Sequence, residues 1–306
     1  MRILLTGVTG QVGNALRAPL VSLGTVVGTD RSWLDLSRPS EVAGILDEIA
    51  PDLIINPAAY TAVDLAEDER ELAYRVNAEA PGAMAEWAAS HDVPMVHFST
   101  DYIFSGSGIR PWREDDPTKP LSIYGASKLA GEVAVRKAGG SHLVIRTSWV
   151  FASKGKNFLN TITSLARERS ELRIVADQVG APTSARSVAE ALISILGVTA
   201  EDDSSEFTQR FEAADGLVHM STSGETSWHG FACAIVDGLR SRGLQLAVSS
   251  VIAIQTREFP TKAVRPHNSR LDTGRLEKVL AVKMPHWRAA LDRELDDLGR
   301  SLTSGG

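Results

Sequence analysis

Short apolar runs alternate with longer amphipathic stretches through the first half of the chain. Each run has the length of a buried strand and ends in small or polar residues. In the longer stretches, such as 39–49 and 124–137, apolar residues recur at helical spacing. This alternation predicts an α/β fold with a doubly wound parallel sheet of the Rossmann type over residues 1–150. The predicted strands lie at 3–5, 25–29, 52–56, 93–98 and 143–150.

The pattern becomes less regular after residue 150. We expect a smaller C-terminal lobe over 151–306, with some of its segments returning to the first domain. A charged amphipathic helix is predicted earlier, at 64–75, and an exposed acidic loop at 201–206. The remaining predictions are helices at 159–169, 184–196 and 227–240, a final helix before the Ser/Gly tail, an extended segment from 173, a turn at 178–183 and a strand at 219–221.

The composition narrows the class of protein. With 43% hydrophobic residues in 306, the chain can bury a sizeable core. A formal net charge of −6 and the lack of a dense Lys/Arg run argue against a nucleic-acid partner. The single cysteine, Cys233, predicts neither an internal disulfide nor a metal site built from thiolates. The apolar run after Met1 is too short for a signal peptide or membrane span, so we expect a cytoplasmic protein with no membrane partner.

A glycine-rich turn separates the first predicted strand from the first helix. Gly7, Gly10 and Gly13 have the spacing G-x-x-G-x-x-G, which differs from the G-x-G-x-x-G of larger dehydrogenases. Such glycines let the backbone turn tightly and approach a pyrophosphate, while the helix N-terminus offers N–H donors. A tight loop without a ligand is the alternative. The position between strand and helix favours a dinucleotide site.

Asp30 follows the second predicted strand, 20 positions after Gly10. An acidic residue at this distance accepts a hydrogen bond from the ribose 2′-hydroxyl of NAD, whereas the adjoining Arg31 could meet the 2′-phosphate of NADP. The cofactor is therefore predicted to be NADPH or NADH, with the choice left open. The alternative is that Asp30 caps a helix in a loop.

Tyr124 and Lys128 lie four residues apart at the start of a predicted helix. This spacing places both side chains on one face, where an ammonium would lower the pKa of the phenol. Such a pair can exchange a proton with a carbonyl or an alcohol, although a chance pair on a helix surface has the same spacing. Thr100 and Asp101 follow the strand at 93–98, at the edge of a parallel sheet where ligands bind.

With these motifs in this order, the chain resembles the extended short-chain dehydrogenases/reductases. Within that superfamily it is similar to the dTDP-4-dehydrorhamnose reductases over nearly its whole length. The narrowest shared strings are D-Q-V-G-A-P-T at 177–183 and R-P-H-N-S-R-L at 265–271. The resemblance implies a Rossmann-type domain with a substrate-binding lobe. It also implies NADPH- or NADH-dependent reduction of the C4 keto group of dTDP-4-dehydro-L-rhamnose, which gives dTDP-L-rhamnose.

The resemblance also implies roles for individual residues. Tyr124 would protonate the C4 oxygen, Lys128 would lower the pKa of Tyr124 and hold the nicotinamide ribose, and Thr100 would hydrogen-bond the carbonyl. Asp101 and Trp149 match sugar contacts, although Trp149 could instead be a core aromatic at a strand end. The predicted cofactor contacts are Gly7, Gly10, Gln11, Val12, Gly13, Asp30, Arg31, Asp35, Leu36, Ala58, Ala59, Tyr60, Thr61 and Lys128.

Other functions on the same fold stay open at this point. A nucleotide-sugar dehydratase or epimerase is one alternative, but the dehydratases have Glu after the Thr-Asp pair, where this chain has Tyr102. A non-catalytic regulatory subunit resembling the β subunit of methionine adenosyltransferase is another. The loop with Arg265 and Arg270 could bind an anion or be a surface turn. The expected partners are a dTDP-sugar and, as one option, a second copy of the chain; no metal is predicted.

Overall fold

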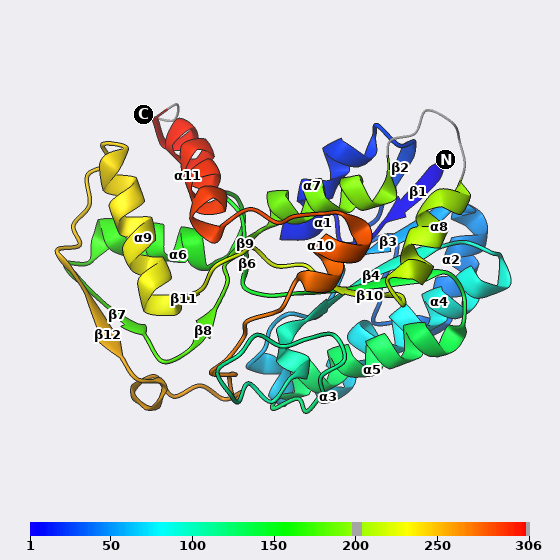
Figure 1. The fold of residues 1–306 in the computed structure, drawn as a ribbon, viewed down its shortest axis with the longest axis horizontal. Helices are drawn as coiled ribbons and strands as arrows, with labels where there is room; N and C mark the ends of the chain where they lie inside the picture. Colours follow the sequence, from blue (N-terminus) through cyan, green and yellow to red (C-terminus); the bar gives the residue numbers. More distant parts are fainter. Residues whose placement is uncertain (198–203, 304–306) are drawn as a thin grey trace.

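The computed structural model describes residues 1–197 and 204–303, and it divides into a sheet-containing part and a smaller lobe (Figure 1). The first part is built on a six-stranded sheet with the strand order β10-β5-β4-β3-β1-β2. All of its neighbours pair in parallel. The fold prediction is therefore confirmed. The strands are β1 (Arg2–Leu5), β2 (Thr25–Gly28), β3 (Leu53–Asn56), β4 (Met95–Thr100), β5 (His142–Thr147) and β10 (Leu217–His219).

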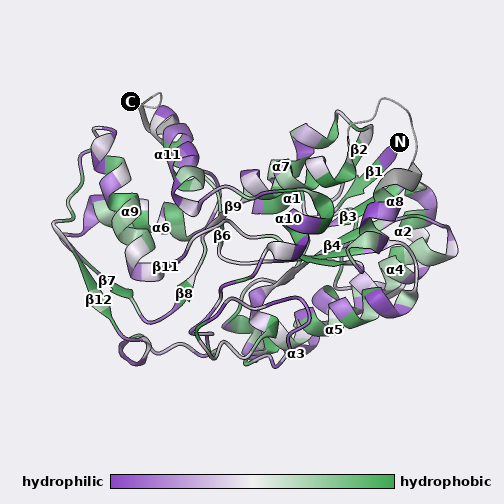
Figure 2. Cartoon of the chain, in the orientation of Figure 1, coloured by the Kyte–Doolittle hydropathy of each residue, from purple (hydrophilic) through white to green (hydrophobic). Residues whose placement is uncertain are grey.

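Alternate residues of the strands enter two separate cores. On β1, Ile3 and Leu5 pack with one layer of helices, while Leu4 packs with the other. Burial on both faces explains why the strands appear as continuous apolar runs. The first layer contains α1 (Gln11–Leu20), α7 (Ala185–Leu196), α8 (Ser204–Ala213) and α10 (Gly274–Leu280). The second contains α2 (Val42–Ile49), α4 (Ala80–Ser90) and α5 (Ile123–Ala138), and Figure 2 shows the hydrophobic sheet between the layers.

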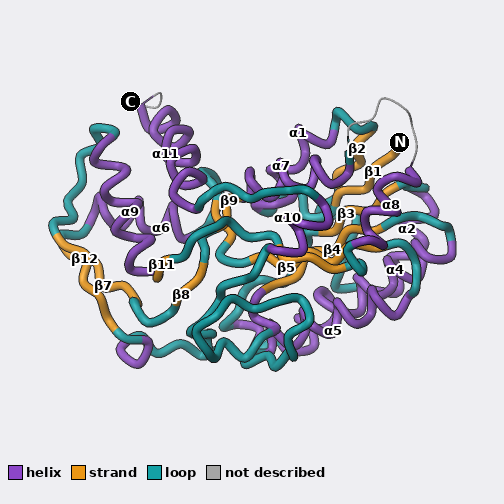
Figure 3. The backbone as a smooth tube through the Cα atoms, viewed as in Figure 1, coloured by secondary structure: helices purple, strands orange, loops and turns teal. Residues whose placement is uncertain are grey.

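The smaller lobe has its own core. Phe151, Leu159, Phe231 and Trp287 are buried in it, and Figure 3 shows that mostly loop segments connect the lobe to the sheet. Its helices are α6 (Phe158–Glu168), α9 (Trp228–Ser241) and α11 (Trp287–Thr303). Its strands form three pairs: β7 (Glu171–Val175) with β12 (Ser250–Ile254), β6 (Val150–Phe151) with β9 (Thr183–Ser184), and β8 (Val179–Gly180) with β11 (Thr226–Ser227).

The segment from 64 to 79 differs from the single helix predicted for 64–75. It forms three short elements: a 3₁₀ turn η2 (Leu65–Glu67), α3 (Arg70–Tyr74) and a π-helix η3 (Arg75–Glu79). The π-helix carries the buried Asn77, whose Oδ1 accepts from Tyr60 N at 2.8 Å and whose Nδ2 donates to Ser127 Oγ at 3.0 Å. A π-helical turn often marks a functional segment, and here it directs a polar side chain inward.

Three other predicted boundaries were wrong. The strand at 143–150 stops at Thr147 because Trp149 adopts a φ of 49°, outside the extended region. The acidic loop at 201–206 is helical from Ser204 onwards, and its first three residues lie outside the described part of the chain. The strand at 219–221 is β10, two residues earlier, and it joins the main sheet beside β5.

Within 1–197 and 204–303, no helix is long and apolar enough to cross a membrane. The remaining short elements are the 3₁₀ turns η1 (Pro39–Glu41), η4 (Asp101–Ile103) and η5 (Thr256–Glu258).

Candidate active site

An open cleft of about 1080 Å³ lies at the carboxyl ends of the strands, on the side of the sheet that faces the lobe. The strand order reverses between β1 and β3, and ligands of open α/β sheets bind at such a point. The cleft brings together all the residues predicted for the site. These are Gly7, Gly10, Gln11, Val12, Gly13, Asp30, Arg31, Asp35, Leu36, Ala58, Ala59, Tyr60, Thr61, Thr100, Asp101, Tyr124, Lys128 and Trp149.

The glycine turn forms one wall of the cleft. Gly7 has a φ of 57°, and a Cβ on it would lie 3.0 Å from Ala58. A Cβ on Gly13 would lie only 2.2 Å from the Gly7 carbonyl oxygen, so glycine is required for α1 to start here. The N-cap of α1 is Gly10, which has no side chain to cover the N–H groups of the first turn. These N–H groups and the positive end of the helix suit a phosphate.

Two carboxylates lie further along the same wall. Asp30 accepts hydrogen bonds from Ser32 N at 2.9 Å and Ser32 Oγ at 2.5 Å, which lowers its pKa. Asp35 accepts from Ser37 N at 2.9 Å, with the same effect on its pKa. Both stay ionised, and their positions are fixed by their own loops. Arg31 is exposed between them, so both an acceptor and a cation are present at this end.

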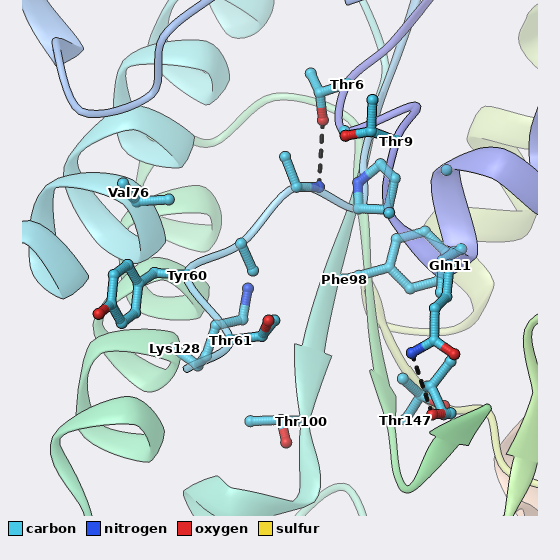
Figure 4. A pocket seen from close by; sticks show the side chains of 18 of the residues that line it. Thr6, Thr9, Gln11, Tyr60, Thr61, Val76, Phe98, Thr100, Lys128 and Thr147 are labelled. Carbon is cyan, nitrogen blue, oxygen red and sulfur yellow. Dashed lines mark hydrogen bonds between the residues drawn. The ribbon is translucent and has the colours of Figure 1, made fainter. Parts of the chain in front are cut away.

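Tyr124, Lys128 and Thr100 meet at the other end of the cleft. Ser122 caps α5 by accepting from Gly125 N at 3.2 Å, which starts the helix one residue before Tyr124. Figure 4 shows Lys128 beside Thr61, and Thr100 below them in the same pocket. Burial lowers the pKa of Lys128 to about 8, and the charge of Glu132 opposes this shift. The amine is therefore close to the point where it can gain or lose a proton near neutral pH.

The pKa of Tyr124 departs from the sequence prediction. Its pKa is raised to about 12, mainly by burial; the Thr100 hydroxyl acts in the opposite direction, and the charge of Asp101 has a smaller raising effect. The predicted lowering by Lys128 is not seen, because the desolvation of the ring dominates. Tyr124 consequently holds its proton at neutral pH. It can serve as a donor when an acceptor arrives.

Asp101 and Trp149 lie beside these residues. Asp101 is only 2% exposed, and burial raises its pKa to about 6. The Trp149 ring stacks on Trp228, with centroids 3.7 Å apart and planes 12° apart. The ring also lies against Gly180, where a Cβ would come within 2.7 Å of the indole. Trp149 is thus half-buried between β8 and α9, on the lobe side of the cleft.

Comparisons with known proteins decide the family. Residues 1–300 match the family model described as "RmlD substrate binding domain". A dTDP-4-dehydrorhamnose reductase from Burkholderia thailandensis is 45% identical over 301 residues, which cover 97% of this chain and 99% of the relative. The chain belongs to the dTDP-4-dehydrorhamnose reductase family. The resemblance stated from the motifs is confirmed.

Solved structures of dTDP-4-dehydrorhamnose reductases have the same fold. The structure from Clostridium acetobutylicum superposes with a TM-score of 0.87 at 34% identity, and the match covers 97% of this chain and 99% of that one. The structure from Bacillus anthracis, in complex with NADP, gives a TM-score of 0.84 at 32% identity with the same coverage. The agreement includes the lobe as well as the sheet, since nearly all of each chain is matched.

The cleft of this family member fits a dinucleotide. Four buried polar atoms that border it have no hydrogen-bond partner in the described part of the chain: Gln11 Oε1, Ser99 Oγ, Asp101 Oδ2 and Thr147 Oγ1. Buried polar atoms are normally paired, so these atoms are available to a ligand. Gln11 itself is held in place because its Nε2 donates to Val150 O at 3.3 Å (Figure 4).

Several residues of the cleft were not predicted from the sequence. Trp228 forms its aromatic wall, and Lys154 and Lys156 are exposed at its edge. The basic turn at 154–156 was visible in the sequence, but nothing tied it to the site. Trp228 is separated from Trp149 by 79 positions, and only the fold shows that they stack.

The loop with Arg265 and Arg270 has no free cation for an anion. Arg265 donates to both carboxylate oxygens of Asp64, at 3.0 and 2.6 Å. Arg270 donates to Glu225 Oε2 and to Asn268 Oδ1, both at 2.8 Å. The structure therefore favours the structural alternative: the loop fixes the ends of separate segments. Among residues 1–197 and 204–303, no cluster of His, Cys, Asp or Glu could hold a metal ion.

Proposed function

We propose that the chain reduces the C4 keto group of dTDP-4-dehydro-L-rhamnose, with NADPH or NADH, to give dTDP-L-rhamnose. The single observation that carries the proposal is that Tyr124, Lys128 and Thr100 line the same cleft as the glycine turn. An acid, a cationic group and a dinucleotide cradle are the parts that a carbonyl reductase needs. The family of the chain supports the same substrate class.

The residues around the carbonyl have distinct roles in this proposal. A bound NADPH or NADH supplies a hydride to C4 of the sugar. Thr100 donates a hydrogen bond to the keto oxygen, and Tyr124 transfers its proton to that oxygen, so that the ketone becomes an alcohol. Lys128 stabilises the phenolate that Tyr124 leaves behind. The raised pKa of Tyr124 keeps its proton in place until the developing alkoxide provides a stronger acceptor.

The cofactor is held along the first wall of the cleft. The N–H groups after Gly10 bind the pyrophosphate, Gln11 and Val12 line its path, and Lys128 holds the ribose next to the nicotinamide. Asp30 and Asp35 accept from the adenosine end, and Arg31 is placed for a 2′-phosphate. The segment at 58–61 runs beside the dinucleotide. Tyr60 is fixed there because its hydroxyl donates to Glu69 Oε2 at 2.6 Å.

The lobe binds the sugar nucleotide. In this proposal, residues 1–150 form the dinucleotide-binding domain, and 151–306 mainly form the substrate lobe. The elements α7, α8, β10 and α10 belong to the second range but pack in the first domain. Asp101 and Trp149 contact the sugar. The exposed Lys154 and Lys156 supply positive charge that suits a diphosphate.

The alternatives are disfavoured by particular groups. A dehydratase would need an acid where Tyr102 stands, but burial raises the pKa of Tyr102 and its ring packs edge-on against Tyr124 at 5.4 Å. A non-catalytic dinucleotide-binding subunit has no need of a buried lysine beside a tyrosine. Such a subunit would only bind the cofactor. An assay of turnover therefore distinguishes it from the enzyme.

The test is a coupled assay in which the keto-sugar is generated in situ and oxidation of the nicotinamide is followed by absorbance. The wild type should oxidise the cofactor, and Tyr124→Phe should be slower by about 10²–10⁴-fold, the usual contribution of a general acid. Cofactor affinity should change by less than about twofold, because only one hydroxyl is removed. Tyr74→Phe is the matched control, since Tyr74 lies on α3 outside the cleft.

Two results would count against the proposal in different ways. A wild type that binds the dinucleotide but leaves it unoxidised points to the regulatory subunit. If the protein reduces another nucleotide sugar but not this keto-sugar, the proposed mechanism is supported and the proposed substrate is wrong.

We further propose that the enzyme works in the cytoplasm as a homodimer. The single half-buried cysteine suits a reducing compartment, and Val133 on α5, 58% exposed, is available for a subunit contact. Light scattering should give about twice the chain mass of 32.9 kDa. A mass equal to one chain at working concentration would contradict the dimer.

A further inference from the structure

A line of buried polar side chains connects Lys128 to the glycine-turn wall. His97 Nε2 lies 3.4 Å from Lys128 Nζ, and His97 Nδ1 lies 3.2 Å from Asn56 Nδ2. Asn56 Oδ1 accepts from Thr6 Oγ1 at 2.6 Å, and Thr6 Oγ1 accepts from Ala58 N at 3.3 Å, the bond drawn in Figure 4. The side chains of Thr6, Asn56, His97 and Lys128 are at most 2% exposed.

The sheet places these groups in register. Leu5 of β1 is aligned with Ile55 of β3, so Thr6 follows beside Asn56. Asn56 is in turn aligned with His97 of β4. Lys128 reaches His97 from α5, which packs on β4. Two strand ends, the middle of β4 and one helix therefore contribute to a single buried line.

His97 cannot be the charged member of this line. Burial and the charge of Lys128 lower its pKa well below the ordinary value for histidine. A neutral imidazole has one N–H and one lone pair, so one nitrogen donates while the other accepts. If Lys128 donates to one ring nitrogen, Asn56 must therefore accept from the other, and the reverse also holds.

The charge of Lys128 limits which tautomers of His97 satisfy both ends. When Lys128 is an ammonium, it donates to His97 Nε2, the proton of His97 is on Nδ1, and Asn56 must present its oxygen to the ring. A neutral amine also has a lone pair, so Nε2–H can then donate to Nζ while Nδ1 accepts from Asn56 Nδ2, which is a tautomer that the ammonium excludes. The second arrangement matches the orientation of Asn56 in the structure, where its oxygen faces Thr6.

We propose that His97 is a positioning residue for Lys128, and that its proton moves between Nδ1 and Nε2 as Lys128 gains or loses charge. The role of Lys128 in the reaction rests on the proposed function, whereas the tautomer change rests only on the contacts of His97. The line gives Lys128 a hydrogen-bond partner in both charge states. It thereby holds the amine in one place while the charge changes.

Other titratable groups leave this coupling intact. Among the described residues, the charge that acts on Lys128 comes from Glu132, one turn later on α5, and the charge that acts on His97 comes from Lys128. Arg75 and Glu79, on the π-helix packed against α5, are exposed. The ionisation of Lys128 is therefore the event that the imidazole follows.

A second buried histidine provides a control within the same molecule. His219 Nε2 lies 3.4 Å from Arg146 Nη1, and its Nδ1 lies 3.1 Å from Trp112 O. Arginine stays protonated and a carbonyl only accepts, so His219 must carry its proton on Nδ1 at every working pH. Both histidines are thus buried. The difference is that Lys128, beside His97, can lose its charge, whereas Arg146, beside His219, cannot.

The test uses ¹⁵N labelling of histidine in the cofactor-free wild type, with nitrogen shifts recorded from pH 6.5 to 9.5. The signals of His97 are identified by their loss in His97→Gln, and those of His219 by their loss in His219→Gln. The proposal predicts that the protonated nitrogen of His97 changes from Nδ1 to Nε2 with a midpoint near the pKa of Lys128, about 8. His219 should keep one tautomer.

Kinetics provide a second readout. Leucine offers no lone pair to the ammonium, so His97→Leu should lower the apparent pKa of Lys128 in the pH profile of kcat and slow turnover by about tenfold. His97→Gln, whose amide can donate or accept, should stay closer to the wild type. Ser127→Ala removes a neighbouring buried hydroxyl that does not contact Lys128, and it should leave the profile unchanged.

One tautomer of His97 across the whole pH range would overturn the proposal, as would a wild-type pH profile in His97→Leu. The nitrogen shifts need no turnover. If the wild type is inactive but His97 still changes tautomer with Lys128, the proposed function fails and the coupling stands.

Discussion

The two sides of the cleft are built in different ways. On the sheet side, the side chains of Thr6, Asn56, His97 and Lys128 are buried and hydrogen-bonded across neighbouring strands and α5. On the lobe side, the stacked Trp149 and Trp228 form an aromatic wall, with exposed lysines at its edge. The first side fixes atoms through directed polar contacts. The second offers surface and charge, which place looser limits on the shape of a ligand.

This difference indicates which side determines the chemistry and which the substrate. A shift of a fraction of an ångström on the sheet side breaks hydrogen bonds that have no replacement in a dry interior. On the lobe side, the same shift leaves an aromatic stack largely intact. We therefore expect substitutions on the sheet side to affect turnover or stability, and substitutions on the lobe side to affect mainly the affinity for the sugar nucleotide.

The largest effect is expected from breaking the buried ion pair behind the sheet side. Arg146 donates to Glu132 from both Nε, at 3.0 Å, and Nη2, at 2.7 Å, and both side chains are almost fully buried. Glu132→Gln leaves the guanidinium charge without a counterion, which should lower the free energy of unfolding by about 3–5 kcal/mol. Denaturant unfolding measures the loss.

The control is the exposed pair of Arg38 and Glu41. Glu41→Gln should change the free energy of unfolding by about 0.5 kcal/mol or less. Similar losses in both variants would contradict the account.

The next largest effect is a pH dependence of stability due to Lys128. Burial lowers its pKa from 10.5 to about 8, so between these values the unfolded chain binds more protons than the folded protein. The free energy of unfolding should therefore rise with pH across this window because of Lys128, by up to about 3 kcal/mol. Lys128→Met should remove the rise when the two proteins are compared by denaturant unfolding at pH 7.5 and 10. An equal rise in both would show that Lys128 is not the cause.

The glycine turn gives a smaller and more local effect. A methyl group at position 13 would meet the Gly7 carbonyl at 2.2 Å, so Gly13→Ala should shift the turn. This shift should weaken NADPH binding by about tenfold to a hundredfold, as measured by calorimetry. Gly44→Ala on α2 is the matched control, because a Cβ there would meet none of the described atoms within 4 Å. It should leave the affinity unchanged and stabilise the helix by roughly 0.5–1 kcal/mol. Equal affinities of the two variants for NADPH would contradict the assignment of Gly13 to the dinucleotide site.

The smallest effect is expected on the lobe side. Trp228→Leu removes the stacking partner of Trp149, and an aromatic pair contributes about 0.5–1.5 kcal/mol beyond its buried area. KM for the keto-sugar should rise by about tenfold or less, with the dinucleotide Kd unchanged. Trp33→Leu, at a 49%-exposed position outside the cleft, is the control. A fall in kcat with an unchanged KM would mean that the stack acts on the chemistry, against the comparison of the two sides.

The sequence predicted the sheet well because its strands are buried on both faces. Runs such as 53–55 are apolar throughout, and the residues that end them mark the edge where ligands bind. The strand β10 was misplaced by two residues, and α8 was missed, since the acidic stretch that precedes it has no apolar periodicity. The helix at 64–75 was wrong because the backbone leaves helical geometry at Glu69, with φ −102° and ψ 44°, between η2 and α3.

The site was predictable where a motif stays within one turn or one strand end. Gly7 to Gly13 and Tyr124 to Lys128 are local, so spacing alone suggests their chemistry. Trp228 and His97 become part of the site only through the stack and the strand register, which join positions far apart in the chain. The pKa of Tyr124 also required the fold, because burial and not its helical neighbour sets the direction of the shift.

The central claim is that this cleft transfers a hydride to C4 while Tyr124 protonates the oxygen. The most direct measurement is turnover of the keto-sugar with NADPH deuterated at both C4 positions of the nicotinamide, followed by NMR of the product. The account predicts dTDP-L-rhamnose with deuterium at sugar C4 from the wild type, and almost none from Tyr124→Phe. Product without deuterium at C4, or an unchanged yield from Tyr124→Phe, would contradict it.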